Sequence, residues 1–424
     1  MFNFQDKQTG GAYLGEGGYG CVFRPNISCE NGKFSEKDKK YISKIMPEDH
    51  GEEEFEVFRR LNIRKIDIKQ KYLIYALEKC DIPKDLDEED IYRCDKLRET
   101  VDNFSSKSRS DKKELVTNAS ETYTNLIQPY GGKTLKAIRI NSLTRQKKKY
   151  ECKDYVLMYL DLLKAVLVLN QNNLCHRDIK YDNIVVSEVN NRYSAKLIDF
   201  GLAEKFVKDV DIDDEEGSPE ATNWSWLSNN LDNQYYLWPV DLICYCKVNG
   251  GAYSKFKQRI DNFPKKPDKI NEIFNIADEI CSVYPINMRL INDIHIQFMF
   301  TSCIRYLIDL FINNVYEDDM EHKLDKIIQN KWDIFMLGVL FSEELRSQRI
   351  EEDDGNLDDF FSEFAKLIIL MTNLNPVERI SLEDCVKKYI EILDENRLEL
   401  EIGRTDLENE KEEIKSILKH KKIV

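Results

Sequence analysis

The stretch Leu174–Gly201 reads LCHRDIKYDNIVVSEVNNRYSAKLIDFG, and the rest of the chain is arranged around it. Two short apolar runs, Ile184–Val186 and Lys196–Ile198, flank a polar turn at Asn190–Asn191. Apolar and β-branched runs separated by turn residues predict a β-hairpin. Polar side chains stand directly before its first strand and directly after its second strand, so the hairpin fixes them relative to one another.

The polar residues at the ends of this hairpin are of the types that phosphoryl transfer needs. Asp178 can accept the proton of an attacking hydroxyl, and Lys180 can neutralise a transferring phosphate. Asn183 and Asp199 offer the oxygen ligands that Mg²⁺ prefers. The alternative is a solvated hairpin whose polar residues occur there by chance, and a second motif upstream argues against it.

That second motif is the glycine-rich stretch AYLGEGGYGCVFR, residues 12–24. Gly15, Gly17 and Gly20 form G-x-G-x-x-G, in which glycine lets the backbone approach phosphate closely. Apolar residues on both sides predict two strands joined by the loop, whereas a dinucleotide-binding fold would place a helix directly after the third glycine. The β-rich run Cys21–Phe23, soon followed by proline, argues against such a helix.

Together these motifs resemble the catalytic loop, the Asp-Phe-Gly metal-binding turn and the glycine loop of eukaryotic-type protein kinases. The resemblance implies an α+β, bilobal fold, with a small β-rich N-lobe over residues 10–131 and a larger, mainly helical C-lobe over residues 132–395. It implies ATP and Mg²⁺ as cofactors and a protein substrate. Lys180 resembles the serine/threonine kinases, because tyrosine kinases usually carry another residue there.

The resemblance also assigns roles to the upstream residues. Lys44, the polar residue inside the strand-like run Tyr41–Met46, would hold the α and β phosphates, and Val22 would pack on the adenine. Asp178, Lys180 and Lys44 would act in catalysis, with Asn183 and Asp199 as the metal ligands. The residues implied in covering the nucleotide are Gly15, Glu16, Gly17, Gly18, Tyr19, Gly20 and Val22.

Lys44 needs a carboxylate partner on a following helix. The run EEEFEVFRRL, which begins at Glu52, has apolar residues at helical spacing. Glu54 lies four residues before Phe58, as the family's helix glutamate does, and is the favoured partner. Glu53 and Glu56 are rivals, and the first glutamates would also complement the helix dipole.

The run Asn125–Gln128, followed by proline and a glycine pair, resembles the hinge between the two kinase lobes. Ile127 would then be the gatekeeper residue beside the adenine. The backbone of Gln128 and Tyr130 would form hydrogen bonds with the edge of the adenine, a role that needs no particular side chain.

Two insertions and a charged tail interrupt the resemblance. The insertion at about 81–121 is polar, and the one at about 243–330 contains helical runs over 270–281 and 294–313. The tail, residues 396–424, includes a capping box from which a helix could run to Lys419. This helix would be docked or solvated, with a coiled-coil partner as the alternative.

The region of the family's Ala-Pro-Glu motif departs from the pattern. Trp238-Pro239-Val240 stands in its place, and Asp241 comes one position later. The family glutamate pairs an arginine that matches Arg379 here, so Asp241 is the candidate substitute. Asp333, in a run that resembles the core helix of the C-lobe, would hold the backbone of the catalytic loop.

Arg177, directly before Asp178, is typical of kinases whose activation loop supplies a negative partner. The acidic cluster Asp209–Glu216 could supply a carboxylate in place of a phosphate, or could simply be a solvated acidic run. The phosphorylation alternatives are Ser218, Thr222 and Ser225.

Composition limits the remaining classes. The 424 residues carry a net charge of −15, which argues against a nucleic-acid footprint, and no stretch is apolar enough to span a membrane. The eleven cysteines are dispersed and lack a CxxC pair, which favours free thiols in a reducing compartment. With no visible secretory signal, we expect a cytoplasmic protein. The sequence contains no signal from which the oligomeric state could be predicted.

Within the protein kinases, the sequence resembles most those of large nucleocytoplasmic DNA viruses such as mimivirus. This resemblance implies that the protein is located in the host cytoplasm or in the virion. Two other functions remain open. A catalytically weak pseudokinase, acting as a nucleotide-binding scaffold, is favoured by the altered Ala-Pro-Glu region. A small-molecule kinase of related fold is disfavoured by the intact His-Arg-Asp and Asp-Phe-Gly motifs.

Overall fold

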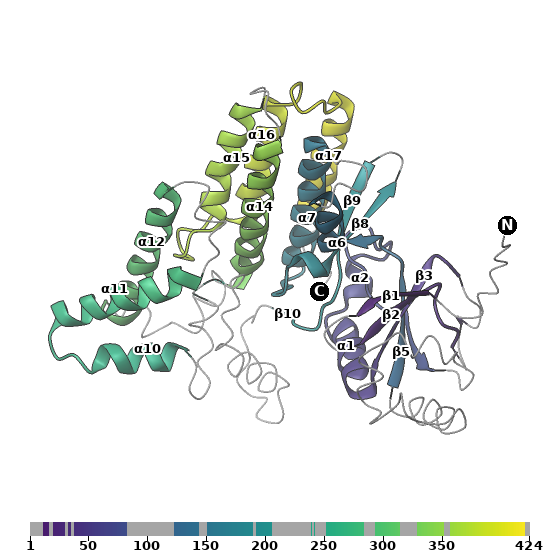
Figure 1. Ribbon diagram of the computed structural model, residues 1–424, viewed down its shortest axis with the longest axis horizontal. Coiled ribbons are helices and arrows are strands. Elements are labelled where there is room, and N and C mark those ends of the chain that lie inside the picture. Colours follow the sequence, from purple (N-terminus) through teal and green to yellow (C-terminus); the bar gives the residue numbers. More distant parts are fainter. Residues whose placement is uncertain are drawn as a thin grey trace. The chain divides into compact units, whose positions relative to one another are not determined.

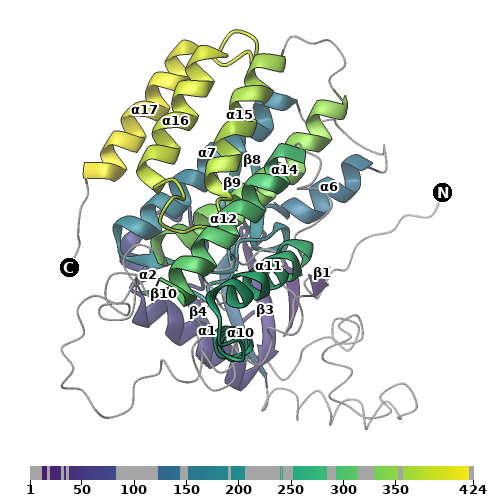
Figure 2. The same ribbon diagram turned by 90° about the vertical axis from the view of Figure 1, so that its left-hand side faces the viewer.

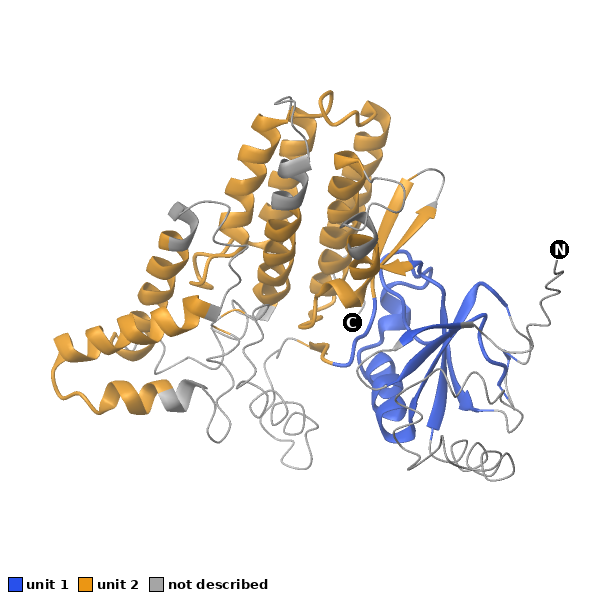
Figure 3. Ribbon diagram, in the orientation of Figure 1, with its two compact units in different colours: residues 1–132, 198–201 blue, residues 133–197, 202–424 orange. Residues whose placement is uncertain are grey.

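The computed structural model describes residues 12–16, 20–29, 33–34, 38–82, 123–143, 151–189, 192–205, 239, 241, 252–283, 293–313, 329–351 and 357–419. The chain divides into two compact units (Figure 3). Unit 1 comprises residues 1–132 and 198–201, and unit 2 comprises residues 133–197 and 202–424. Unit 1 contains a β-sheet and unit 2 is mostly helical, so the predicted α+β kinase-like class is confirmed.

Unit 1 is built on a five-stranded antiparallel sheet with the strand order β1-β2-β3-β5-β4. Its strands are β1 (Ala12–Glu16), β2 (Cys21–Arg24), β3 (Tyr41–Pro47), β4 (Glu78–Asp81) and β5 (Tyr123–Pro129). Helix α1 (Glu48–Arg60) packs on β3 and β5 and is followed by the short α2 (Ile63–Ile66). A Cβ at Gly51 would lie 2.1 Å from Cγ2 of Thr124, so glycine permits this close approach.

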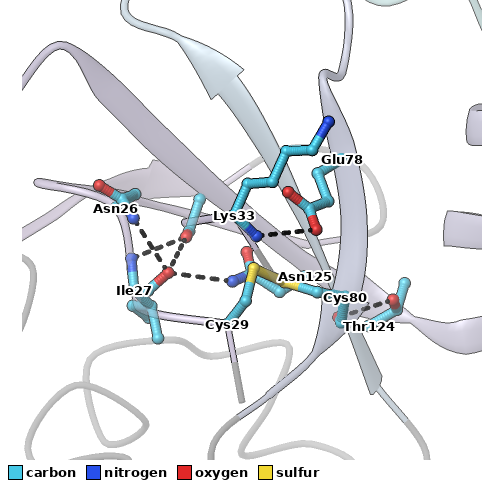
Figure 4. Close-up of a disulfide and its surroundings, with 9 residues drawn as sticks. Asn26, Ile27, Cys29, Lys33, Glu78, Cys80, Thr124 and Asn125 are labelled. Carbon is cyan, nitrogen blue, oxygen red and sulfur yellow. Dashed lines mark hydrogen bonds between the residues drawn. A yellow bond between two sulfur atoms is a disulfide. The ribbon is translucent and has the colours of Figure 1, made fainter. Parts of the chain in front are cut away.

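The sheet face opposite α1 carries apolar side chains and a disulfide between Cys29 and Cys80 (Figure 4). The two cysteines form a buried cluster with Ile127 of β5. Cys21 is disulfide-bonded as well. The expectation of free thiols is therefore wrong for unit 1, because residues far apart in sequence meet across the sheet. The described cysteines of unit 2 remain thiols: Cys152, Cys175, Cys281, Cys303 and Cys385.

Unit 2 is organised around helix α7 (Cys152–Gln171), which is buried along almost all of its length. It packs against α14 (Trp332–Glu351), α16 (Leu382–Glu395) and α17 (Arg404–Lys419) (Figure 1). Helix α15 (Asp358–Met371) lies between α14 and α16. The remaining described elements around this core are α6 (Leu135–Leu143), β6 (Lys133–Thr134), β7 (Leu174–Cys175), β8 (Ile184–Val189), β9 (Arg192–Leu197), β10 (Glu204–Lys205) and the 3-10 turns η2 (Tyr181–Asn183) and η5 (Gln329–Lys331).

The predicted insertion at 243–330 forms a group of helices in unit 2 (Figure 2). These are α10 (Ala252–Asp261), α11 (Lys266–Val283) and α12 (Asp293–Phe311), of which α11 packs on both others. Two contacts join α12 to the segment before α16: the Leu374 N–H donates to Ser302 Oγ at 3.3 Å, and Arg305 pairs with Glu378 at 2.9 Å. Most of the first insertion, from residue 83 to residue 122, lies outside the described residues.

The helix predicted in the charged tail is docked rather than solvated. Lys164 of α7 is 1% exposed, and its Nζ lies 2.6 Å from Glu410 and 3.1 Å from Glu413, both on α17. Asp161 lies 3.0 Å from the same Nζ. Arg192 of β9 contacts Glu410 at 2.6 Å and Asp161 at 3.0 Å. Charged residues of the tail therefore belong to the interior of unit 2.

Candidate active site

The predicted hairpin is present as β8 and β9, which pair antiparallel from Ile184↔Leu197 to Val189↔Arg192. The polar loop that precedes β8 contains Asp178, which is 8% exposed. Lys180 Nζ lies 2.7 Å from Asp178 Oδ2. The structure thus brings together two of the predicted catalytic residues.

Asn183 holds the same aspartate from the other side. Its Nδ2 donates to the backbone oxygen of Asp178 at 2.9 Å and to Oδ2 at 2.7 Å. Because both amide hydrogens are used on Asp178, Oδ1 of Asn183 is the atom that can ligate a cation. The loop therefore fixes the orientation of the Asp178 carboxylate and leaves the amide oxygen as the Asn183 atom that could bind a cation.

Asp333, at the start of α14, fixes the backbone of this loop as predicted. Its two carboxylate oxygens accept from the His176 N–H at 2.7 Å and the Arg177 N–H at 2.9 Å. Burial raises the pKa of Asp333, and the hydrogen bonds and charges of His176 and Arg177 oppose that rise. Arg177 takes a left-handed conformation with φ of 62°, which these contacts hold in place.

The partner of Arg177 is a residue that sequence reasoning missed. Its Nε donates to the Leu202 backbone oxygen at 2.6 Å, and its Nη2 lies 3.4 Å from Glu204 Oε2. The predicted partners, Asp209–Glu216, lie outside the described residues. A carboxylate three residues after the Asp-Phe-Gly turn was the available signal, but its side-chain direction depends on the pairing of β10 with β7.

Asp241 pairs with Arg379, as the shifted motif suggested. Arg379 Nη2 lies 2.5 Å from Oδ1 of Asp241, and Nη1 lies 3.3 Å from Oδ2. Both side chains are 0% exposed. Trp332 Nε1 also donates to Oδ2 at 2.9 Å. Asp241 therefore occupies the ion pair that the family's glutamate would make, one position later in the chain.

Unit 1 carries the predicted lysine pair. Lys44 Nζ lies 2.5 Å from Oε2 of Glu54, while the rival Glu56 pairs with Arg59. Burial would lower the pKa of Lys44, but the nearby Asp199 and Glu54 carboxylates raise it above its usual range, so Lys44 stays protonated. Burial raises the pKa of Glu54, and the charge of Lys44 opposes this rise.

Asp199 belongs to unit 1 together with Lys44. The next residue, Phe200, packs edge-on against Phe58 of α1, with ring centroids 5.8 Å apart. This contact places the Asp-Phe-Gly turn beside the helix that carries Glu54. A protonated lysine beside two carboxylates is suited to bind phosphate and a divalent cation together.

The glycine motif joins β1 and β2, with Glu16 opposite Cys21. A Cβ at Gly20 would lie 2.1 Å from the Ile45 backbone oxygen, so a side chain does not fit there. Val22 pairs with Lys44 and therefore lies on the same face of the sheet. Three of the predicted nucleotide-binding residues, Gly17, Gly18 and Tyr19, lie outside the described residues.

Two details of the predicted hinge are wrong. Lys44 pairs with Leu126 and Ser43 pairs with Ile127, so Ile127 lies on the face opposite Lys44. Ile127 packs in the disulfide cluster instead and is not the gatekeeper. Thr124, Leu126 and Gln128 are the β5 residues that share the face of Lys44.

The backbone N–H of Tyr130 is also engaged. It donates to the Lys40 backbone oxygen at 2.7 Å, continuing the pairing of β3 with β5. The hinge prediction required this amide to form a hydrogen bond with the edge of the adenine. Because the amide already donates to Lys40, it is not available for that bond. Strand β5 includes Pro129, whereas the predicted strand ended at Gln128.

Asn183 in unit 2 and Asp199 in unit 1 each offer an oxygen of the type that Mg²⁺ prefers. Within the described part of the chain, no group of three or more His, Cys, Asp or Glu side chains could hold a metal ion. Mg²⁺ is commonly bound by one or two protein ligands together with substrate phosphates. Asp199 and Asn183 match that requirement in type.

Comparison with known proteins agrees with this chemistry. The family model described as "Protein kinase domain" matches residues 110–390, a range that includes Asp178, Asn183 and Asp199 but begins after Lys44. The chain is similar to "Probable serine/threonine-protein kinase nek3" of Dictyostelium discoideum, with 24% identity over 37% of this chain and 15% of the relative. It is also similar to "Calcium-dependent protein kinase 4" of Plasmodium falciparum, with 26% identity over 26% of this chain and 21% of the relative.

The chain thus spans only 15% and 21% of the length of these two relatives. The family match, in contrast, covers well over half of the chain. It contains the catalytic loop, the Asp-Phe-Gly turn and Arg379. The chain belongs to the protein kinase domain family.

Proposed function

We propose that this chain transfers the γ-phosphate of ATP to serine or threonine hydroxyls of protein substrates. The observation that carries the proposal is the hydrogen-bonded set of Asp178, Lys180 and Asn183 in the catalytic loop. The Lys44–Glu54 ion pair in unit 1 supports it. Serine and threonine specificity rests on Lys180 and on the printed names of distant relatives.

In this proposal, each residue has a defined task. Asp178 orients the substrate hydroxyl and accepts its proton, while Lys180 neutralises charge on the transferring group. Lys44 binds the α and β phosphates, and Glu54 holds Lys44 in position. Asn183 and Asp199 would ligate Mg²⁺, which, when bound, neutralises the developing phosphate charge.

The remaining nucleotide contacts come from the sheet of unit 1. The glycine loop, including Gly17, Gly18 and Tyr19, would cover the phosphates, and Val22 would pack on the adenine. Leu126 and Gln128 replace Ile127 as the β5 side chains nearest the adenine, because they share the face of Lys44.

The test is transfer of label from γ-labelled ATP with Mg²⁺ to generic acidic and basic proteins. Asp178→Asn keeps the shape of the side chain but removes the proton acceptor, so we expect label incorporation to fall by at least about a hundredfold. Asp278→Asn, an exposed position on α11, is the matched control and should keep full activity.

Label on serine or threonine in wild type, lost in Asp178→Asn, would support the proposal. Nucleotide binding without any transfer, equal in wild type and variant, would instead favour a pseudokinase scaffold. Transfer to a metabolite panel but to no protein would favour a small-molecule kinase. The likeness to kinases of large DNA viruses and the cytoplasmic location stay predictions; among the described residues, no helix is long and apolar enough to cross a membrane.

A further inference from the structure

We infer that Glu204 is a positioning residue: a carboxylate encoded in the chain that holds Arg177, and through it Asp178, without a phosphate on the protein. The inference rests on the proposed kinase activity and concerns how the catalytic loop is kept in its working geometry. It assigns a role to a residue outside the predicted catalytic set.

The first step is the burial of Arg177. Its guanidinium is among the largest fully buried side chains, at 1% exposure. A buried charge is costly unless opposite charge and hydrogen bonds compensate it. The Leu202 backbone oxygen accepts from Nε at 2.6 Å, and Glu204 Oε2 lies 3.4 Å from Nη2. Glu204 therefore supplies negative charge to a cation that water does not reach.

The second step is the way in which Glu204 itself is held. It lies on β10, which pairs antiparallel with β7, and the register places Glu204 opposite Cys175. The thiol of Cys175 also contacts the Glu204 backbone oxygen at 3.6 Å. The carboxylate thus comes from a strand fixed directly beside the start of the catalytic loop.

The third step links Arg177 to the reacting group. The backbone N–H of Arg177 donates to Asp333, and its side chain contacts the segment 202–204, so the residue is fixed from two directions. Asp178 is the next residue in the chain. A shift of Arg177 would therefore move the carboxylate that accepts the substrate proton.

Two consequences follow for activity. Without the Glu204 charge, Asp178 should be held less accurately, so kcat should fall while KM for ATP stays nearly constant. Misplacement of a catalytic group by about 1 Å can cost about a hundredfold. Because Glu204 is part of the chain, activity should also not depend on phosphorylation of Ser218, Thr222 or Ser225.

The experiment compares phosphatase-treated wild type with Glu204→Gln, Glu204→Asp and the control Glu391→Gln, an exposed glutamate on α16. Glu204→Gln keeps the size of the side chain and removes its charge. We expect kcat to fall about tenfold to a hundredfold in Glu204→Gln. Partial recovery should occur in Glu204→Asp, and Glu391→Gln should show no change. The triple variant Ser218→Ala, Thr222→Ala, Ser225→Ala should keep wild-type kcat.

Unchanged kcat in Glu204→Gln, or loss of activity after phosphatase treatment or in the triple variant, would overturn the inference. A rise in KM for ATP with constant kcat would overturn it as well. Hydrogen exchange of the segment 174–183 gives a readout that needs no turnover. Faster exchange there in Glu204→Gln than in Glu391→Gln supports the positioning role, and equal exchange contradicts it. An inactive wild type with faster exchange in Glu204→Gln would contradict the proposed function alone.

Discussion

At the scale of single residues, the buried charges of this kinase domain are matched by partners far away in sequence. Asp241 and Arg379 are both fully buried and face each other at 2.5 Å. The pair also holds Trp332, through its indole N–H, at the start of α14. Such a pair does not by itself add much stability, but breaking it leaves one charge buried without its partner.

We therefore predict that Asp241→Ala is strongly destabilising. Removing the carboxylate leaves the Arg379 guanidinium buried, which should lower the free energy of unfolding by about 3–5 kcal/mol. Denaturant unfolding followed by circular dichroism measures this difference. Asp278→Ala, at an exposed position, is the control and should change the free energy of unfolding by less than about 0.5 kcal/mol. An equal, small effect of both variants would contradict the structural role of the pair.

At the scale of elements, strand alternation in unit 1 decides which residues face the predicted nucleotide site. Lys44, Val22 and Leu126 share one face of the sheet, whereas Ile127 faces the other side. On that second face, the disulfide ties the segment after β2 to the edge strand β4. It closes a loop of 51 residues, which restricts the unfolded chain.

We predict that Cys29→Ser with Cys80→Ser lowers the stability of the chain by about 2–4 kcal/mol. The measurement is thermal unfolding with and without a dithiol reductant. Thiol–disulfide exchange reduces the protein disulfide to two thiols and oxidises the reductant to its own disulfide. Wild type should lose stability when reduced. The double variant should start lower and lose less stability than wild type when reduced, because it lacks the Cys29–Cys80 disulfide but keeps the disulfide of Cys21. An identical melting temperature in all four samples would contradict a structural disulfide.

At the scale of the whole molecule, the segment furthest along the described chain completes the interior of unit 2. Helix α17 packs on α7, and its Glu410 contacts Lys164 and Arg192. Burial would raise the pKa of Glu410, but these two cations lower it below its usual value. The ion cluster thus joins α7, β9 and α17. Its residues on α7 and α17, Lys164 and Glu410, are 246 residues apart in the sequence.

The lowered pKa of Glu410 makes a prediction for acid stability. A carboxyl group whose pKa is depressed in the folded state binds protons more readily when unfolded, so its contribution is full above its usual pKa. That contribution is lost as the pH falls through the folded-state pKa. We expect the free energy of unfolding of wild type to decrease more steeply below about pH 4.5 than that of Glu410→Gln. Parallel pH profiles would contradict this assignment.

Local sequence was sufficient for the features that depend on neighbouring residues. The β8–β9 hairpin followed from two apolar runs around a turn, and the glycine motif between two strands followed from its flanking residues. Helical spacing singled out Glu54 as the partner of Lys44, and the two residues are in contact. These patterns repeat over a few residues, so they leave a direct trace in the sequence.

Tertiary structure alone decided the features that depend on strand pairing. The register of β3 with β5 turned Ile127 away from Lys44, and the pairing of β7 with β10 brought Glu204 to Arg177. The disulfide likewise joins cysteines 51 residues apart. A shift of one residue in register turns a side chain to the opposite face, and nothing within a single strand records which register its partner selects.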